Sequence, residues 1–139
     1  MMSQLGLPVE EFTTPNPFTV VEETPISELN RIMSEEGFRH LPVMRGERVV
    51  GIVSERDLRV ASGLSLLEKM LVHAGDIMVS DPVTVSSEDS IEEVAFIMSQ
   101  NKIGSVIVND MNDKFLGIFT VTDALNALIE VSRLPQKEI

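Results

Sequence analysis

The sequence contains two copies of a stretch in which a short apolar strand changes into a helix: Gly51-Ile52-Val53-Ser54-Glu55-Arg56-Asp57 and Gly117-Ile118-Phe119-Thr120-Val121-Thr122-Asp123. The β-branched and bulky residues of each copy favour a strand, and good helix formers follow. A helix begins with backbone N–H groups that have no partner inside the helix, and these lie at the positive end of its dipole. Each copy therefore predicts a strand-to-helix junction that can hold an anion.

Each junction also carries a hydroxyl residue, Ser54 or Thr120, with an Asp three positions later, Asp57 or Asp123. This spacing is typical of a capping box, which stabilises the start of a helix and needs no ligand. The same Asp could instead accept hydrogen bonds from a neighbouring pair of ligand hydroxyls. A cap and a binding site can share the N-terminus of one helix, which we call the mouth of that helix. The spacing alone therefore leaves both interpretations open.

The two junctions belong to a longer internal repeat. An offset of 65 relates residues 17–43 to residues 82–108, and one extra residue in the second turn makes the offset 66 at the junctions. Such a repeat predicts two units with the order strand–helix–strand–strand–helix, and therefore an α/β fold. We expect repeat 1 over residues 9–63, a connecting segment over 64–75 and repeat 2 over 76–133. Within repeat 2 we expect Asp89 to cap the first helix, with Glu92 completing a capping box.

Composition excludes several classes of function. The chain of 139 residues has no Cys, which excludes disulfides, zinc–thiolate sites and thiol nucleophiles. Its formal net charge of −11 argues against nucleic acid as a partner. We find neither a nucleophile paired with a base nor a group of residues at metal-ligand spacing, so we expect no catalysis and no metal. Without a 20-residue apolar run or a signal segment, we expect a cytoplasmic protein that does not enter a membrane.

The chain resembles a tandem pair of CBS domains, also called a Bateman module. The resemblance covers about residues 9–131 and rests on the opening Asp76-Ile77-Met78, the two P-x-T-V strands, the run Arg39-His40-Leu41-Pro42-Val43 and the two junctions. There are two departures from the family pattern. Thr13 stands where the family often has the Met seen at Met78, and Gly104-Ser105 stands where repeat 1 has Arg39-His40.

The resemblance implies two repeats packed about a pseudo-twofold axis, with sheets facing inward and two clefts between them. It also implies a non-catalytic regulatory or sensor module that binds an adenine nucleotide (AMP, ADP, ATP or NAD) as a regulatory ligand. In such modules the hydroxyl resembles a phosphate or ribose contact, and the Asp accepts from the ribose hydroxyls. The candidate site residues are Thr19, Val20, Arg39, His40, Ile52, Ser54, Arg56 and Asp57 in repeat 1 and Thr84, Val85, Gly104, Ser105, Ile118, Thr120, Thr122 and Asp123 in repeat 2.

The resemblance places Arg39 and His40 at the border of a cleft, where Arg39 is the stronger phosphate candidate; the alternative is that both are solvated rim residues. Arg56 could turn either to phosphate or to Glu55 and solvent. Lys102 is a further candidate for the second cleft. Related modules pair through amphipathic helices, so we also expect a homodimer that uses helices such as residues 123–131. The alternative is a ligand-free assembly module whose helices pair with another copy or with an effector protein.

Overall fold

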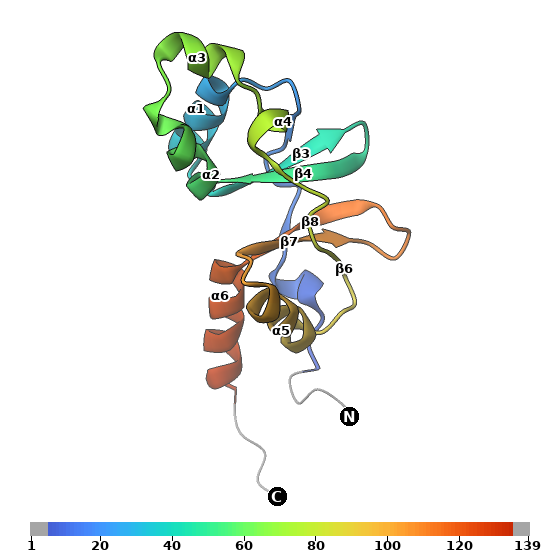
Figure 1. Ribbon diagram of the computed structural model, residues 1–139. Coiled ribbons are helices and arrows are strands. Elements are labelled where there is room, and N and C mark those ends of the chain that lie inside the picture. Colours follow the sequence, from blue (N-terminus) through green and yellow to red (C-terminus); the bar gives the residue numbers. More distant parts are fainter. Residues whose placement is uncertain (1–5, 135–139) are drawn as a thin grey trace, which may run out of the picture. The chain divides into compact units, whose positions relative to one another are not determined.

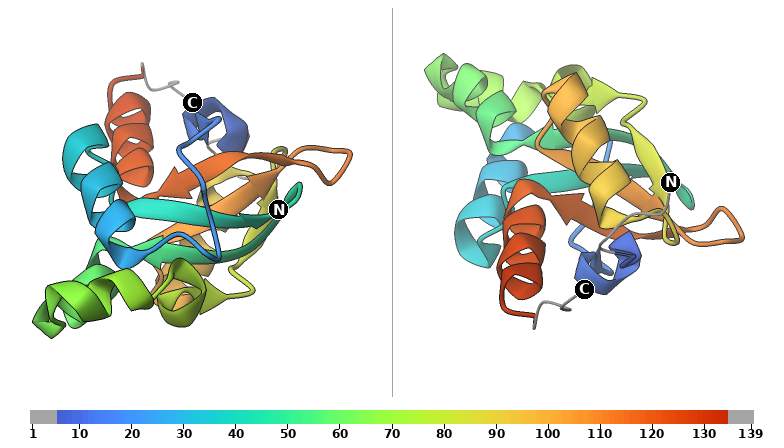
Figure 2. Two further views of the ribbon diagram at one scale, coloured as in Figure 1. Left: turned by 90° about the horizontal axis from the view of Figure 1, so that it is seen from above. Right: turned by 90° about the horizontal axis from the view of Figure 1, so that it is seen from below.

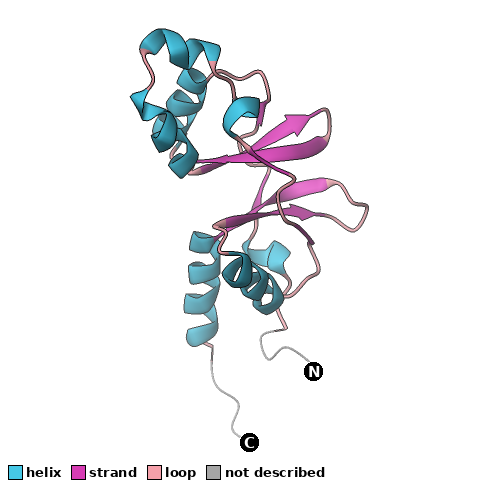
Figure 3. Cartoon of the chain, viewed as in Figure 1, coloured by secondary structure: helices cyan, strands magenta, loops and turns pink. Residues whose placement is uncertain are grey.

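The computed structural model describes residues 6–134, which fold into two compact units (Figure 1). The central unit comprises residues 16–83, and the terminal unit comprises residues 6–15 together with residues 84–134. Each unit contains one four-stranded mixed sheet, with helices on one face of its strands (Figure 3). This is the α/β architecture with two similar units that the repeat predicts.

The central unit follows the strand–helix–strand–strand–helix order and then adds short helices. Its sheet has the order β2-β3-β4-β5, with β2 parallel to β3 and the other neighbours antiparallel. Its elements are β2 (Val20–Val21), α1 (Ile26–Glu36), β3 (His40–Arg45), β4 (Arg48–Ser54), α2 (Glu55–Val60), the 3-10 turn η2 (Ala61–Gly63), α3 (Leu66–Leu71), α4 (Ala74–Ile77) and β5 (Val79–Ser80).

The terminal unit repeats this plan with the sheet order β1-β8-β7-β6. Here β6 is parallel to β7, and the other neighbours are antiparallel. Its elements are the 3-10 turn η1 (Val9–Phe12), β1 (Thr14–Pro15), β6 (Thr84–Ser86), α5 (Ile91–Asn101), β7 (Ser105–Asn109), β8 (Phe115–Thr120) and α6 (Val121–Ser132).

The register of the two sheets matches position by position. His40 lies opposite Ser54 across β3 and β4, and Ser105 lies opposite Thr120 across β7 and β8. Both hairpins also shift register at equivalent points, after Val43 and after Val108. The hydroxyl residue therefore ends its strand at the same place in both units.

Each unit takes its outermost strand from the beginning of the other sequence repeat. The strand β5, near the start of repeat 2, pairs with β4, and β1, near the start of repeat 1, pairs with β8. A Cβ at Gly51 would overlap the thioether of Met78, and one at Gly117 would overlap the backbone carbonyl of Thr14. The crossing segments therefore approach the sheets closely at both glycines, and the neighbour is fixed backbone at Gly117 but a flexible side chain at Gly51.

Each unit has its own apolar core between sheet and helices. In the central unit the fully buried side chains include Ile26 and Leu29 of α1 packed against Leu41 and Val53 of the sheet. In the terminal unit Phe119 of β8 stands at the position equivalent to Val53, and it is fully buried in the same core as Val94 of α5. These cores anchor the strands that end at the two helix mouths.

One capping residue differs from what the sequence led us to expect. The expected cap at Asp89 is wrong: Ser90 is the N-cap of α5 and accepts from the N–H of Glu93 at 3.1 Å, while Asp89 accepts from the N–H of Ser86 at 2.9 Å in the preceding turn. The helical content expected for residues 64–72 of the connecting segment is confirmed as α3, which projects from the edge of the central unit (green in Figure 2). Its exposed side chains include Leu66, Leu67, Met70 and Leu71.

Within residues 6–134, no helix combines the length and apolarity needed to span a membrane.

Candidate functional site

The mouth of α2 is closed by reciprocal hydrogen bonds between Ser54 and Asp57. Oδ2 of Asp57 accepts from the backbone N–H of Ser54 at 2.8 Å and from its hydroxyl at 2.9 Å. The Ser54 hydroxyl oxygen accepts in turn from the backbone N–H of Asp57 at 3.2 Å. This is the predicted capping box, and it fixes the carboxylate at the end of β4.

The mouth of α6 has the same arrangement in the terminal unit. Oδ2 of Asp123 accepts from the N–H of Thr120 at 2.9 Å and from its hydroxyl at 3.1 Å, and the Thr120 hydroxyl accepts from the N–H of Asp123 at 3.4 Å. The duplication seen in the sequence is therefore a duplication of geometry.

The capping boxes use one of the two oxygens of each Asp carboxylate. Within the described chain, both hydrogen bonds to Asp57 and both hydrogen bonds to Asp123 end on Oδ2, and Oδ1 accepts none. An ionised carboxylate accepts through both oxygens, so Oδ1 can accept from a ligand while Oδ2 holds the cap. The capping interpretation is confirmed, and it does not compete with a binding role.

An apolar pocket of about 370 Å³ lies beside Asp57. Its walls are Val60, Ala61 and Leu64 from the end of α2 and the following turn, with Ile77 from α4. None of the residues that line this pocket is aromatic, so aliphatic walls are what it can offer to the flat face of a base. The carboxylate and the apolar walls together provide one polar and one apolar contact for the same ligand.

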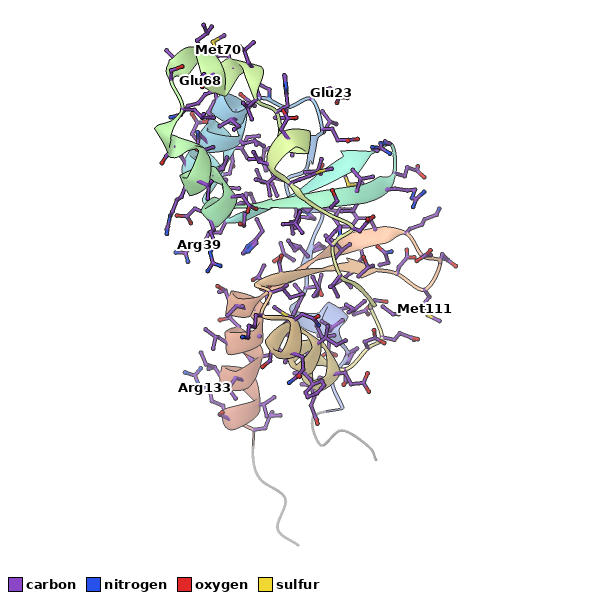
Figure 4. The ribbon with its side chains drawn as sticks, viewed as in Figure 1. Glu23, Arg39, Glu68, Met70, Met111 and Arg133 are labelled. Carbon is purple, nitrogen blue, oxygen red and sulfur yellow. The ribbon has the colours of Figure 1, made fainter. Side chains whose placement is uncertain are left out.

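On the other side of α2, three charged residues line a second pocket, of about 500 Å³. Glu55 forms ion pairs with Arg59, at 3.0 Å from Nη2 to Oε1, and with Arg39, at 3.7 Å from Nε to Oε2. Figure 4 shows Arg39 at the edge of the central unit near α2, with its side chain directed outward. Arg56 is exposed to solvent, as one of its two predicted alternatives has it, but Glu55 pairs with Arg39 and Arg59 and not with Arg56.

His40 begins β3 beside this cluster, and its side chain is half-buried. Burial lowers the pKa of His40 below its ordinary value, and the positive charge of Arg39 lowers it further, while Asp57 and Glu55 act in the opposite direction. The imidazole is therefore neutral at pH 7 in the absence of a ligand, and it can gain a proton when an added negative charge approaches.

The backbone shows that Gly104 is the counterpart of Arg39. The carbonyl of Arg39 accepts from the N–H of Glu55 at 2.8 Å, and the carbonyl of Gly104 accepts from the N–H of Val121 at 3.1 Å. The structure thus brings Arg39, His40, Ser54 and Asp57 together at one mouth. It brings Gly104, Ser105, Thr120 and Asp123 together at the other.

The other predicted site residues are more dispersed. The side chains of Val20 and Val85 lie in the two cores, so only their backbone groups could meet a ligand. Ile52 and Ile118 are buried on the central strands of the sheets. Thr19 and Thr84 are exposed near the starts of β2 and β6. Exposed side chains also include Arg56 and Thr122, in the first turns of α2 and α6, and Lys102, which follows α5.

The chain matches the model of the CBS domain over residues 9–63 and again over residues 74–130. It belongs to the CBS domain family. A crystal structure of CBSX2, a CBS-pair protein of Arabidopsis thaliana, in complex with AMP is similar to this chain with a TM-score of 0.78 and 27% sequence identity, covering 92% of this chain and 100% of that chain. A CBS domain-containing protein of Dictyostelium discoideum is 27% identical over 133 residues, which cover 88% of this chain and 92% of the relative.

Another relative is an inosine-5'-monophosphate dehydrogenase of Korarchaeum cryptofilum, which is 37% identical over 114 residues. These cover 82% of this chain and 23% of the dehydrogenase. The chain therefore spans about a quarter of that relative's length, and most of the dehydrogenase has no counterpart in the CBS pair described here.

Three features of the CBS pair's candidate site were not among the predicted site residues: Glu55, Arg59 and the pocket walls Val60, Ala61, Leu64 and Ile77. A Glu followed four positions later by an Arg is an ordinary surface pair on a helix, so nothing in this spacing connects the pair with Arg39. Within the described residues, no group of three or more His, Asp or Glu side chains could hold a metal ion.

Proposed function

We propose that this CBS pair is a regulatory module that binds an adenine nucleotide, AMP, ADP, ATP or NAD, and does not itself catalyse a reaction. The observation that carries the proposal is the duplicated helix mouth in which Oδ1 of Asp57 and Oδ1 of Asp123 remain available. A ribose presents two adjacent hydroxyls that can donate to one carboxylate. Hydrogen bonds to a charged acceptor are worth about 1.5–3 kcal/mol each, enough to select ribose over deoxyribose.

The surroundings of Asp57 support the rest of a nucleotide. The apolar pocket of Val60, Ala61, Leu64 and Ile77 suits a base. His40 at the mouth, with Arg39 nearby, suits phosphate groups. The similar protein CBSX2 is in complex with AMP, which favours an adenine nucleotide as the ligand of this chain.

The two mouths should differ in their response to phosphate. Arg39 and His40 in the central unit correspond to Gly104 and Ser105 in the terminal unit, which carry no charge. We therefore propose that the central unit's mouth tolerates more phosphate groups than the terminal unit's mouth does.

Thermal denaturation with a panel of nucleotides tests this proposal. A ligand at 100 times its Kd adds about 2.7 kcal/mol to the free energy of unfolding. We expect AMP, ADP, ATP or NAD to raise the Tm, and 2'-deoxy-AMP and GMP at equal concentration to raise it less. If no member of the panel changes the Tm, the nucleotide-binding function is wrong.

A second function, assembly with another protein chain, is favoured by the exposed face of α6. Val121, Leu125, Leu128 and Ile129 recur at helical spacing, and each has between 47% and 61% of its surface exposed. An apolar stripe of this kind on a helix usually meets a partner. We propose that this partner is a second copy of the chain, so that the module is a homodimer, and that an effector protein responds to the bound nucleotide.

A further inference from the structure

We propose that Glu55 competes with the phosphate groups of the ligand for Arg39 and Arg59, and so sets how strongly the central unit responds to the number of phosphates. This inference rests on the proposed nucleotide-binding function and assigns a specificity-determining role to a residue outside the predicted site.

The first support is the geometry of the cluster. The two oxygens of Glu55 each serve one arginine, Oε1 for Arg59 at 3.0 Å and Oε2 for Arg39 at 3.7 Å. The side chains of Arg39 and Arg59 are 79% and 75% exposed, so both guanidinium groups are open to solvent on their outer sides. A phosphate group has the same recognition chemistry as a carboxylate toward arginine, so the two would compete for these groups.

The second support is the position of the cluster at the mouth of α2. The backbone N–H of Glu55 donates to the carbonyl of Arg39 at 2.8 Å, and Asp57 follows in the same helical turn. A ribose held by Oδ1 of Asp57 would place its phosphates beside this turn. There they would meet the negative charge of Glu55 as well as the two arginines.

The third support is a comparison of the two repeats. The positions of Arg39, Glu55 and Arg59 in the central unit correspond to Gly104, Val121 and Leu125 in the terminal unit. All three charges occur together in one repeat and all three are absent from the other. Since the terminal unit forms the same sheet and helix mouth without them, the fold does not need the cluster, and the three charges act as one functional group.

Exposed ion pairs contribute little net stability, so the pairs of Glu55 could be ordinary surface contacts with no further role. In that case removing the carboxylate would leave ligand affinity unchanged. The same weakness is what a displaceable competitor requires, because a phosphate can then take over the arginines at small cost. The two explanations therefore differ in their effect on binding rather than in their effect on folding.

The test is calorimetric titration of the whole chain and its Glu55→Gln variant with adenosine, AMP and ATP. We expect the affinity for adenosine to stay within about twofold, because adenosine has no phosphate to gain from released arginines. We expect AMP to bind the central unit more tightly by about twofold to thirtyfold, the range given by releasing two exposed ion pairs, and ATP to gain more than AMP does.

The matched control is Glu22→Gln. Glu22 pairs with Arg45 at 2.8 Å at the opposite end of β3, so this variant also removes one paired negative charge from the central unit. We expect it to leave the AMP and ATP affinities within about twofold of the unmodified chain, since its charge lies far from the mouth. An equal gain in both variants would show a general charge effect and overturn the proposal.

Two further outcomes would also overturn it. If AMP binds the unmodified chain but binds Glu55→Gln equally or more weakly, Glu55 is not a competitor, and the nucleotide-binding function stands without it. If neither chain binds any of the three compounds, the function and this inference both fail. Should Glu55→Gln fold poorly, Glu55→Val supplies the residue found at the same position of the second repeat, and the same titration applies.

Discussion

Oδ2 of Asp57 accepts two hydrogen bonds from Ser54, one from its backbone N–H at 2.8 Å and one from its hydroxyl at 2.9 Å. The same oxygen therefore closes the cap of α2, while Oδ1 faces no described donor. The cap and the proposed ribose contact therefore use different oxygens of one carboxylate. The pair Thr120 and Asp123 repeats this division at the mouth of α6.

The cap itself predicts a cost in stability. Replacing Ser54 with Ala removes the side-chain acceptor of the Asp57 N–H, and loss of an N-cap side chain costs about 1 kcal/mol. In a chain of this size we expect the Tm to fall by about 2–8 °C. Ser54→Gly is the control, because glycine at an N-cap costs only about a few tenths of a kcal/mol relative to Ser. Equal melting of the Ala variant and the unmodified chain in a thermal scan would show that the cap is not formed.

Two glycines at equivalent positions should respond differently to substitution. In Gly117→Ala the new methyl group would overlap the backbone carbonyl of Thr14, which cannot move without disturbing the pairing of β1 with β8. In Gly51→Ala the methyl group would meet the flexible side chain of Met78. We expect overpacking at Gly117 to cost about 1–3 kcal/mol and the cost at Gly51 to be smaller. Urea denaturation measures both, and a larger loss at Gly51 would contradict the structure.

His40 predicts a pH dependence of stability. Burial lowers its pKa in the folded chain below the ordinary value of 6.5, so the unfolded chain binds more protons just below pH 6.5. The free energy of unfolding should therefore be at its full value above pH 6.5 and fall as the pH drops from 6.5 through the lowered pKa. Denaturation of His40→Gln between pH 7.5 and about 5 should show a shallower decline over this window. His73→Gln controls for removal of a histidine as such. A decline that persists unchanged in His40→Gln would exclude His40 as its source.

Much of this architecture follows from the sequence. The repeat predicted the element order, and the hydroxyl–x–x–Asp spacing predicted both capping boxes, because these depend on contacts three residues apart. The cap of α5 was misplaced by one residue. Asp89 and Ser90 are both good caps, and only the turn at Ser86 decides which of them faces the helix.

The sequence pattern did not predict that each unit takes its edge strand from the other repeat. The strands β1 and β5 have two residues each, too few to show an alternation of apolar and polar residues. The glycines Gly51 and Gly117 were the available signal, since both repeats keep a residue without Cβ where another backbone segment passes. The cluster around Glu55 could not be predicted either, because it joins residues 16 positions apart through a fold contact.

The apolar stripe of α6 predicts the oligomeric state. We expect the unmodified chain to be a dimer at tens of micromolar in light scattering, and Leu128→Glu to shift it toward the monomer, because the new charge would be buried at the interface. Met111→Glu is the control, since Met111 is 73% exposed at the tip of the β7–β8 hairpin, where Figure 4 shows it apart from α6. A monomeric unmodified chain, or equal dissociation of both variants, would count against a dimer through α6.

In the proposed function, Asp57 and Asp123 bind ribose through Oδ1. Substitution with Asn keeps one oxygen as the acceptor for the cap and places an N–H donor where the ribose hydroxyls need an acceptor. We therefore expect Asp57→Asn and Asp123→Asn to melt within a few degrees of the unmodified chain. Each should lose the adenine-nucleotide affinity of its own mouth.

The most direct measurement is calorimetric titration of AMP into the unmodified chain, Asp57→Asn and Asp123→Asn, with 2'-deoxy-AMP into the unmodified chain as the ligand-side control. Loss of a charge-assisted hydrogen bond predicts a Kd raised by about ten- to a hundredfold at the substituted mouth, with a similar weakening for the deoxy compound. Full AMP affinity in both variants, together with a lower Tm, would show that these carboxylates only cap helices and would make assembly the leading function.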